Sequence, residues 1–167
     1  MGASVFPRVY HHRADRMGDH PLRSVVAVVI TITLAGEPVG KGRPKFSRAS
    51  GRAYTPAKTA NTEAFVKSEA VRQAGQALLE GPLRLNVLAV VSIPASWSKK
   101  KQVAALAGEI RPTGKPDLDN IAKLYADALN GILWKDDSQI VRMRLEKRYG
   151  AYPETVLTVG GVDEALD

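Results

Sequence analysis

The segment from residue 115 to residue 149 constrains the fold most, because it predicts a helix, a tight turn and a strand in direct succession. Apolar residues recur at helical spacing on one side of residues 117–130, and Gly131 ends the pattern. In residues 139–149 apolar and polar side chains alternate instead, which predicts a strand. Their expected core face carries Val141, Met143 and Leu145, and their polar face carries Arg142, Arg144, Glu146 and Arg148. That polar face can meet DNA, a partner subunit or water. The three elements form a compact unit in which the turn can fold back toward the start of the helix.

The other runs of β-branched and apolar residues predict further strands. Residues 25–36 and 83–93 are predicted strands, and a last strand ends at Val159. No internal repeat or second domain is visible. The expected organisation is a disordered leader (1–24), one domain (25–160) and a C-terminal tail (161–167).

Two further helices are indicated by their start and stop residues. Thr55 and Pro56 are typical of an N-cap and a first helical position, so a helix is predicted from there to about residue 79. One side of it carries Phe65, Val71, Gly75 and Leu78. Ser98 is expected to cap a short basic helix that ends at Gly108.

An acidic cluster accompanies the helix of residues 117–130. Five of the nine aspartates in the chain fall within 21 residues: Asp117, Asp119, Asp127, Asp136 and Asp137. If residues 115–119 are extended, Asp117 and Asp119 point to one face, and on a helix Asp119, Lys123 and Asp127 stack. Hard cations such as Mg²⁺ prefer carboxylate oxygens, and phosphodiester hydrolysis needs a metal ion to activate water and stabilise charge. The cluster therefore predicts a metal site.

Structural roles are the alternative for each of these residues. Asp117, Asp119 or Asn120 can be helix caps, and the two aspartates at 136 and 137 can form a solvated turn. For Asp127 we favour a surface ion pair with Lys123. Lys123 itself can offset the acidic charge, stabilise developing negative charge, or be a plain surface lysine.

The loop of residues 38–62 contains six cations and no acidic residue: Lys41, Arg43, Lys45, Arg48, Arg52 and Lys58. Phe46 and Tyr54 are interleaved among them. A flexible basic loop with aromatic residues suits a DNA backbone and exposed bases, and a solvated loop is the alternative. Trp97 precedes a second cluster, Lys99–Lys101, and either stacks on a base or packs against the protein.

Composition narrows the function classes. The net charge of +7 and the pI near 9.8 favour a polyanionic partner. The chain has no cysteine and its three histidines lie in the leader, which excludes thiolate chemistry and leaves zinc sites and histidine triads without ligands. No Walker-type loop is present. The longest apolar run begins at Val25 and is too short to span a bilayer, so we expect a cytoplasmic location.

Four motifs together resemble one known family. They are KGRPKFSR, GRAYTP, SWSKKK and KPDLDNIAKLYADALNGILWKDDSQIV, and the last is long and specific. Over residues 28–159 the chain resembles the RusA family of Holliday junction resolvases, endodeoxyribonucleases of bacteria and their phages. The resemblance implies a small α+β fold, a mixed β-sheet with helices packed on it, acting as a symmetric homodimer. It also implies Mg²⁺-dependent paired nicks across four-way DNA in recombination and repair, with Mn²⁺ as a plausible substitute.

The resemblance also assigns residues. By motif, the essential carboxylates are Asp117, Asp119 and Asp137, and the conserved lysine is Lys123, while Asp136 is at most a supporting acid. The expected DNA-binding residues are Lys41, Arg43, Lys45, Arg48, Lys99 and Lys100. A nuclease for flaps or forks, and a non-catalytic DNA-binding protein of the same fold, are the rival interpretations.

Overall fold

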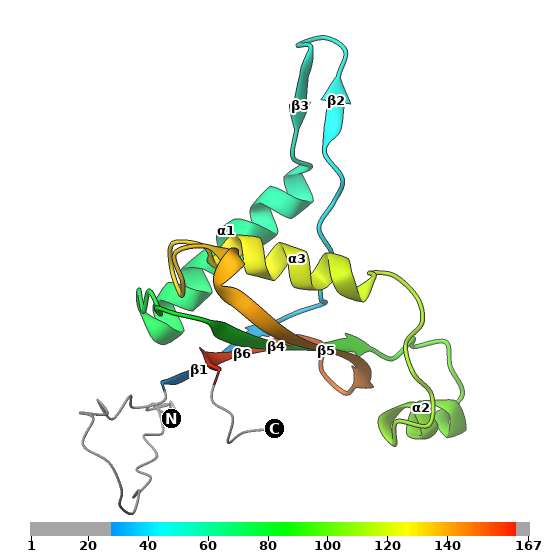
Figure 1. Ribbon diagram of the computed structural model, residues 1–167. Coiled ribbons are helices and arrows are strands. Elements are labelled where there is room, and N and C mark those ends of the chain that lie inside the picture. The colour runs from blue at the N-terminus through cyan, green and yellow to red at the C-terminus, as the bar shows by residue number, and fades with distance from the viewer. Residues whose placement is uncertain (1–27, 163–167) are drawn as a thin grey trace, which may run out of the picture.

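Four strands form the central sheet of the computed structural model, which describes residues 28–162 (Figure 1). Their order is β1 (Val29–Ala35), β6 (Glu154–Gly161), β4 (Leu83–Ser92) and β5 (Ile140–Gly150). Strands β1 and β4 pair antiparallel with β6, whereas β4 and β5 are parallel. The prediction of a mixed sheet in an α+β fold is confirmed. The predicted leader, residues 25–27 of the first predicted strand and residues 163–167 of the predicted tail lie outside the described residues, and Gly161, the first residue of that predicted tail, belongs to β6.

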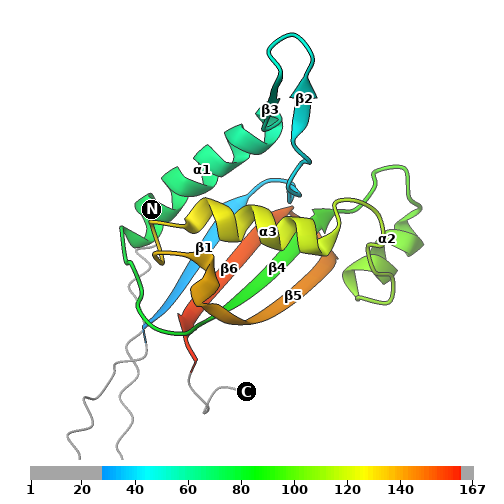
Figure 2. The same cartoon turned by 45° about the horizontal axis from the view of Figure 1, so that its top comes forward.

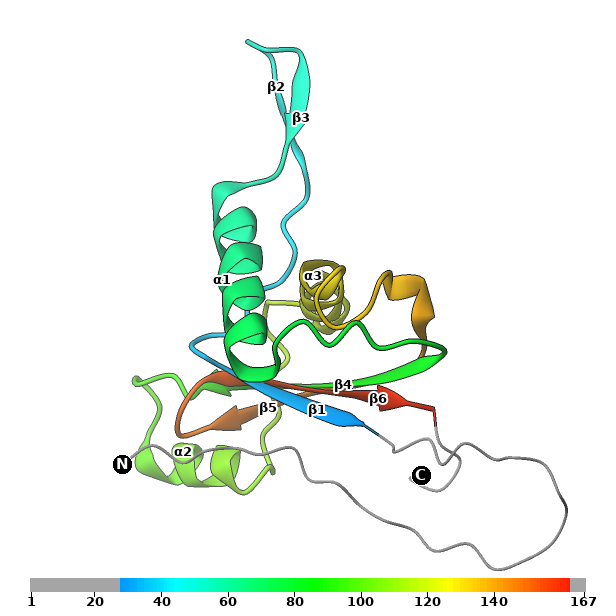
Figure 3. The ribbon, with the colours of Figure 1, turned by 90° about the vertical axis from the view of Figure 1, so that its left-hand side faces the viewer.

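Two helices cover one face of this sheet, and the third lies on the other side (Figure 3). Helices α1 (Ala57–Ala74) and α3 (Leu118–Leu129) pack on the apolar face. Its fully buried side chains include Ile32, Leu85, Val87, Leu157 and Val159. Helix α2 (Lys99–Leu106) contacts β5 and is capped by Ser98, whose hydroxyl accepts from the Lys101 N–H, as predicted. Among the described residues no helix is long and apolar enough to cross a membrane.

The prediction of which side of α1 faces the core is wrong. Thr59, Val66 and Ala70 are the buried residues, whereas Phe65 and Val71 are 44% and 49% exposed. The helix also starts one residue later than predicted, with Pro56 as its N-cap, and ends at Ala74 rather than near residue 79. Helix α1 packs against α3 and β1, with Thr59, Val66 and Ala70 as its buried side chains.

A projecting β-hairpin replaces part of the predicted basic loop. Strands β2 (Lys45–Ser47) and β3 (Arg52–Tyr54) pair antiparallel and rise away from the helices (Figures 1 and 2). Gly51 turns the chain with a φ of 63° and donates its N–H to the Ser47 carbonyl. We call residues 42–56 the basic arm. Three residue pairs that turn no apolar face toward the core are too short to produce a recognisable alternation in the sequence.

Strand β5 lies at one edge of the sheet, and the burial of its side chains differs from the prediction. Val141 and Met143 were expected in the core but are 62% and 42% exposed, and only Leu145 packs partly against it. The register between β4 and β5 shifts at Leu83, so that one residue of β5, Val141, is left over as a bulge. An edge position and a bulge both leave apolar side chains uncovered.

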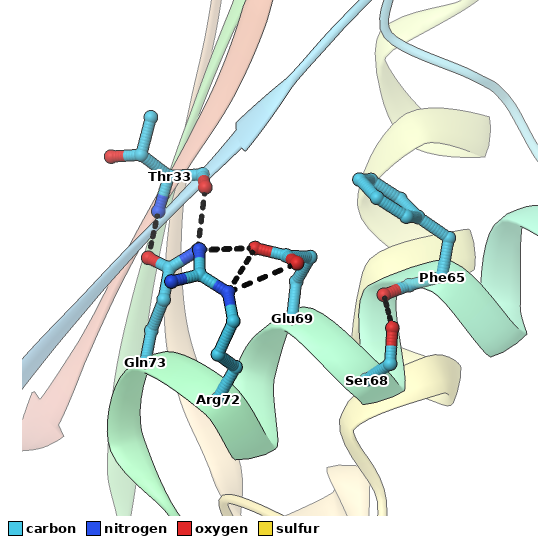
Figure 4. Close-up of polar contacts among 6 residues, drawn as sticks. All are labelled: Thr33, Phe65, Ser68, Glu69, Arg72 and Gln73. Atoms are coloured by element: carbon cyan, nitrogen blue, oxygen red, sulfur yellow. Dashed lines mark hydrogen bonds and ion pairs between the residues drawn. The ribbon is translucent and has the colours of Figure 1, made fainter.

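A glutamine side chain covers the opposite edge of the sheet, at β1 (Figure 4). The Thr33 N–H donates to Gln73 Oε1 at 3.0 Å, and Gln73 Nε2 donates to the Thr33 carbonyl at 2.8 Å. Glu69 also accepts from Gln73 Nε2 and pairs with Arg72. The amide therefore satisfies backbone groups that an edge strand would otherwise leave unpaired.

Replacing Gln73 by alanine is expected to lower the free energy of unfolding by about 1–2 kcal/mol, since two hydrogen bonds to the backbone are lost. Urea denaturation followed by circular dichroism measures this. Arg72→Ala is the control, because it removes only an ion pair at the surface of the same helix and should have a smaller effect. Equal effects of the two changes would contradict the role of Gln73.

Candidate active site

Helix α3 turns the side that carries part of the predicted acidic cluster toward solvent. Its apolar face is buried as predicted, through Ile121, Leu124, Tyr125 and Ala128. Asp119 and Lys123 are exposed on the opposite face, and Asp127 is half-buried there. Asp117 occupies the N-cap position, but its side chain makes no capping hydrogen bond. The carboxylate of Asp117 is exposed and receives only a 3.5 Å hydrogen bond from the Asn120 amide.

The turn after α3 is anchored by Trp134, whose side chain is fully buried. Its Nε1–H donates to Asn130 Oδ1 at 2.7 Å. Gln139 Oε1 accepts the N–H groups of Lys135 and Asp136, and so closes the turn. Together these contacts set the position of the following 3-10 helix, Asp137–Gln139.

The two adjacent aspartates in this turn have different surroundings. Asp136 caps the 3-10 helix by accepting the Ser138 N–H at 2.9 Å, and this hydrogen bonding to Ser138 lowers the pKa of Asp136. Asp137 is half-buried instead. Partial burial raises the pKa of Asp137, and the nearby carboxylate of Asp127 raises it further. The carboxylate of Asp136 therefore serves as a helix cap, whereas that of Asp137 faces the carboxylate of Asp127.

Asp127 does not form the expected surface ion pair with Lys123. Its carboxylate pairs with Lys41 Nζ, which also lies 3.5 Å from Glu63. Partial burial acts to lower the pKa of Lys41, but the hydrogen bond and charge of Asp127, with a contribution from Glu63, raise it overall. Lys41 is one of the expected DNA-binding residues, but the structure places its ammonium group between the carboxylates of Asp127 and Glu63.

The predicted metal ligands are not gathered into one group. Asp119, Lys123 and Asp127 follow one another along α3 at steps of about 6 Å, with Asp137 at the far end of the row. Asp117 lies just before the near end. Within residues 28–162, no three acidic or histidine side chains are close enough to form a ready-made ion site. The structure shows a row of acids with one pair in contact, Asp127 and Asp137.

A basic groove of about 830 Å³ adjoins the near end of this row. It lies between the root of the basic arm and the starts of α1 and α3. The charged side chains that line it are Lys41, Arg43, Lys58, Lys115 and Asp117. Lys41 is paired with Asp127, and the other three cations against one acid suit a phosphate backbone that passes Asp117.

Sequence reasoning missed Lys147, which positions the start of α3. Its Nζ donates to the carbonyls of Gly114 at 2.6 Å and Pro116 at 3.0 Å. These carbonyls belong to the segment that leads into Asp117. One signal was present in the sequence, because Lys147 interrupts the apolar side of the alternation in residues 139–149.

Comparison with known proteins identifies the family. The model of the family described as "Endodeoxyribonuclease RusA" matches residues 35–160, most of the chain. The chain belongs to the RusA family. A curated relative, the uncharacterized protein YqaN of Bacillus subtilis (strain 168), is 37% identical over 134 residues, which cover 78% of this chain and 94% of the relative. RusA proteins are endodeoxyribonucleases that resolve Holliday junctions, and the predicted resemblance is confirmed.

The second basic cluster lies away from the acidic row of this RusA-family chain. Helix α2, with Lys99 and Lys100, is on the other side of the sheet from α1 and α3 (Figure 3). Trp97 packs edge-on against Tyr149 with ring centroids 5.2 Å apart, and Lys101 Nζ lies 3.8 Å from the Trp97 ring centroid. Packing is therefore the observed role of Trp97.

Lys41→Ala is expected to lower the free energy of unfolding by about 1 kcal/mol in the absence of divalent ions. The change leaves Asp127 beside Glu63 and Asp137 without the cation that offsets them. Arg43→Ala, at an exposed position of the same segment, should leave stability nearly unchanged. Thermal unfolding in EDTA compares the two, and equal stability of both variants would contradict a neutralising role for Lys41.

Proposed function

We propose that this RusA-family chain is a Mg²⁺-dependent endonuclease that resolves four-way DNA junctions by paired symmetric nicks in recombination and repair. The observation that carries the proposal is the acidic row of α3 beside an acid-poor basic groove. A protein that only binds DNA gains nothing from carboxylates facing phosphate, because they repel it. The acidic row therefore favours hydrolysis over binding alone.

Asp117, Asp119 and Asp137 are the proposed ligands of Mg²⁺, for which Mn²⁺ can substitute. Their oxygen donors fit a hard cation, which usually binds one or two carboxylates together with substrate phosphates and waters. Asp117 and Asp119 lie at one end of the acidic row and Asp137 at the other, so we propose that the first two would hold one ion and Asp137 another, each with few protein ligands. We therefore expect weak Mg²⁺ binding without DNA. When bound, the ion supplies an activated water and charge stabilisation. Lys123, exposed between Asp119 and Asp127, would stabilise negative charge that develops on the phosphate.

Cleavage assays on three labelled substrates test the function: a four-way junction, a flap and a linear duplex, each with Mg²⁺ or EDTA. We expect metal-dependent, symmetric nicks confined to the junction, which Asp119→Asn abolishes while junction binding survives. Equal cutting of all three substrates would favour the broader branched-DNA nuclease. Tight junction binding without any cutting would favour a non-catalytic binding protein.

The basic arm is the proposed contact for the DNA backbone. Replacing Arg43, Lys45 and Arg48 together by alanine should reduce the slope of log K against log salt by up to about 2–3, since each lost phosphate contact contributes roughly 0.9. Fluorescence anisotropy at several salt concentrations measures the slope. The double change of Lys99 and Lys100 tests the α2 cluster in the same way, with up to about 2 expected if both contact phosphate. A slope unchanged by either variant would remove that cluster from the interface.

A symmetric homodimer is part of the same proposal. A four-way junction has two-fold symmetry, so two symmetric cuts require two active sites related by the same symmetry. Strand β5 supports it, because its edge exposes Val141 and Met143 in the part of the chain that the structure describes. Light scattering coupled to size-exclusion chromatography gives the mass directly, and a monomer at assay concentrations would contradict a dimer.

A further inference from the structure

The basic arm carries an aromatic side chain that the protein does not cover. Phe46 is 67% exposed at the projecting hairpin (Figure 1). In the β2–β3 register Phe46 lies opposite Ala53, whereas Lys45 lies opposite Tyr54. Paired residues share a face of a two-stranded hairpin and successive residues alternate between faces, so Phe46 and Ala53 form a small apolar face while Lys45 and Arg52 lie on the opposite face. Such a face on a short hairpin contributes little to folding.

The root of the arm is fixed to the helix that carries the acids. The Lys41 N–H donates to the Asn120 carbonyl of α3 at 2.8 Å, and the Gly42 N–H donates to Thr59 Oγ1 of α1 at 3.1 Å. Gly40 packs so closely that an added Cβ would lie 3.0 Å from the Pro116 side chain. The position of the arm is therefore set relative to Asp117 and the basic groove.

The charge of the arm selects the kind of partner. Residues 42–56 hold four cations, Arg43, Lys45, Arg48 and Arg52, and no acid, so a protein surface would need to be strongly acidic to match the arm. Nucleic acid supplies both a dense negative backbone and flat base faces on which an aromatic ring stacks. A continuous duplex buries those faces between neighbours, and opening a step costs a few kcal/mol. At a branch point, by contrast, the stacking of bases is interrupted.

We propose that the basic arm senses the branch point: Phe46 stacks on a base exposed at the centre of the junction. This inference rests on the proposed function and adds the residue that selects branched over linear DNA. The arm cations hold the flanking phosphates, the groove guides the strand past Asp117, and Phe46 marks the discontinuity. A duplex meets the cations but offers no open base face.

The test measures binding by Asp119→Asn protein to a four-way junction with 2-aminopurine at the branch point, and to a duplex of the same sequence. Phe46→Ala should lose about tenfold in junction affinity, the order that one stacked base contributes, with little change for duplex. It should also lose the fluorescence change that binding causes at the branch point. Phe46→Trp should keep both. The matched control is Tyr152→Ala, which removes an exposed aromatic residue from the β5–β6 turn and should alter neither.

Different failures give different results in this design. Three results would each overturn the role of Phe46. Phe46→Ala could leave junction affinity and fluorescence unchanged, or it could lose affinity equally for junction and duplex. Tyr152→Ala could also show the same losses as Phe46→Ala. Phe46 is exposed, so an unchanged melting temperature should accompany the loss of affinity. If the wild-type protein fails to cut the junction while the Phe46-dependent fluorescence persists, the nuclease proposal fails and the branch-sensing role stands.

Discussion

Asp137→Asn is expected to lower the rate of junction cleavage by about a hundredfold or more. The change keeps the shape of the side chain but removes the negative charge proposed to bind the metal ion. Loss of several kcal/mol of charge stabilisation in the transition state corresponds to at least this factor. Single-turnover cleavage with saturating enzyme isolates the chemical step, and a parallel gel-shift assay should show that junction binding persists.

Asp136→Asn is the matched control, because it makes the same chemical change at the adjacent residue. Asp136 caps the 3-10 helix through the Ser138 N–H, and an asparagine oxygen can accept the same hydrogen bond. We expect cleavage within a few-fold of wild type and a similar melting temperature. If both variants lose activity equally, the assignment of different roles to the two acids is wrong.

Trp134→Ala is expected to have the largest effect on stability, about 3–5 kcal/mol. The side chain is fully buried in the core, and its indole N–H is bonded to Asn130. The cavity and the unpaired Asn130 oxygen should together lower the melting temperature by roughly 10 °C for a chain of this size. Differential scanning calorimetry measures the shift.

Trp97→Ala is the comparison within the same protein, since Trp97 is half-buried and packs against Tyr149 at the edge of the sheet. We expect a clearly smaller loss of stability. Trp134 also anchors the turn that carries Asp137, so residual folded Trp134→Ala protein should cleave poorly at low temperature. Full activity of that protein would show that the turn is positioned without Trp134.

The elements with long periodic patterns were predictable. The helix of residues 117–130 was placed within about a residue, as were the strands from residues 83 and 139, because their apolar spacing extends over several turns or alternations. The family followed from the motif around Asp117 and Asp119, which depends on residue order alone.

Short-range signals were weaker guides. The β2–β3 hairpin has three residue pairs and no apolar face toward the core, so sequence periodicity could not reveal it. The inner side of α1 was misassigned because the sheet accepts Ala70 and Val66, and large apolar residues such as Phe65 remain outside.

The sequence by itself determined the family, the mixed α+β class and the amphipathic helix that carries the acids, since local order and hydrophobic period encode these. Only the tertiary structure decided which charges meet. Lys41 and Asp127 are 86 residues apart, yet Lys41 forms the ion pair expected of Lys123. Asp137 faces Asp127 because the buried Trp134 turns the chain back onto α3. Such pairings depend on how elements pack, and no spacing rule along the chain contains that information.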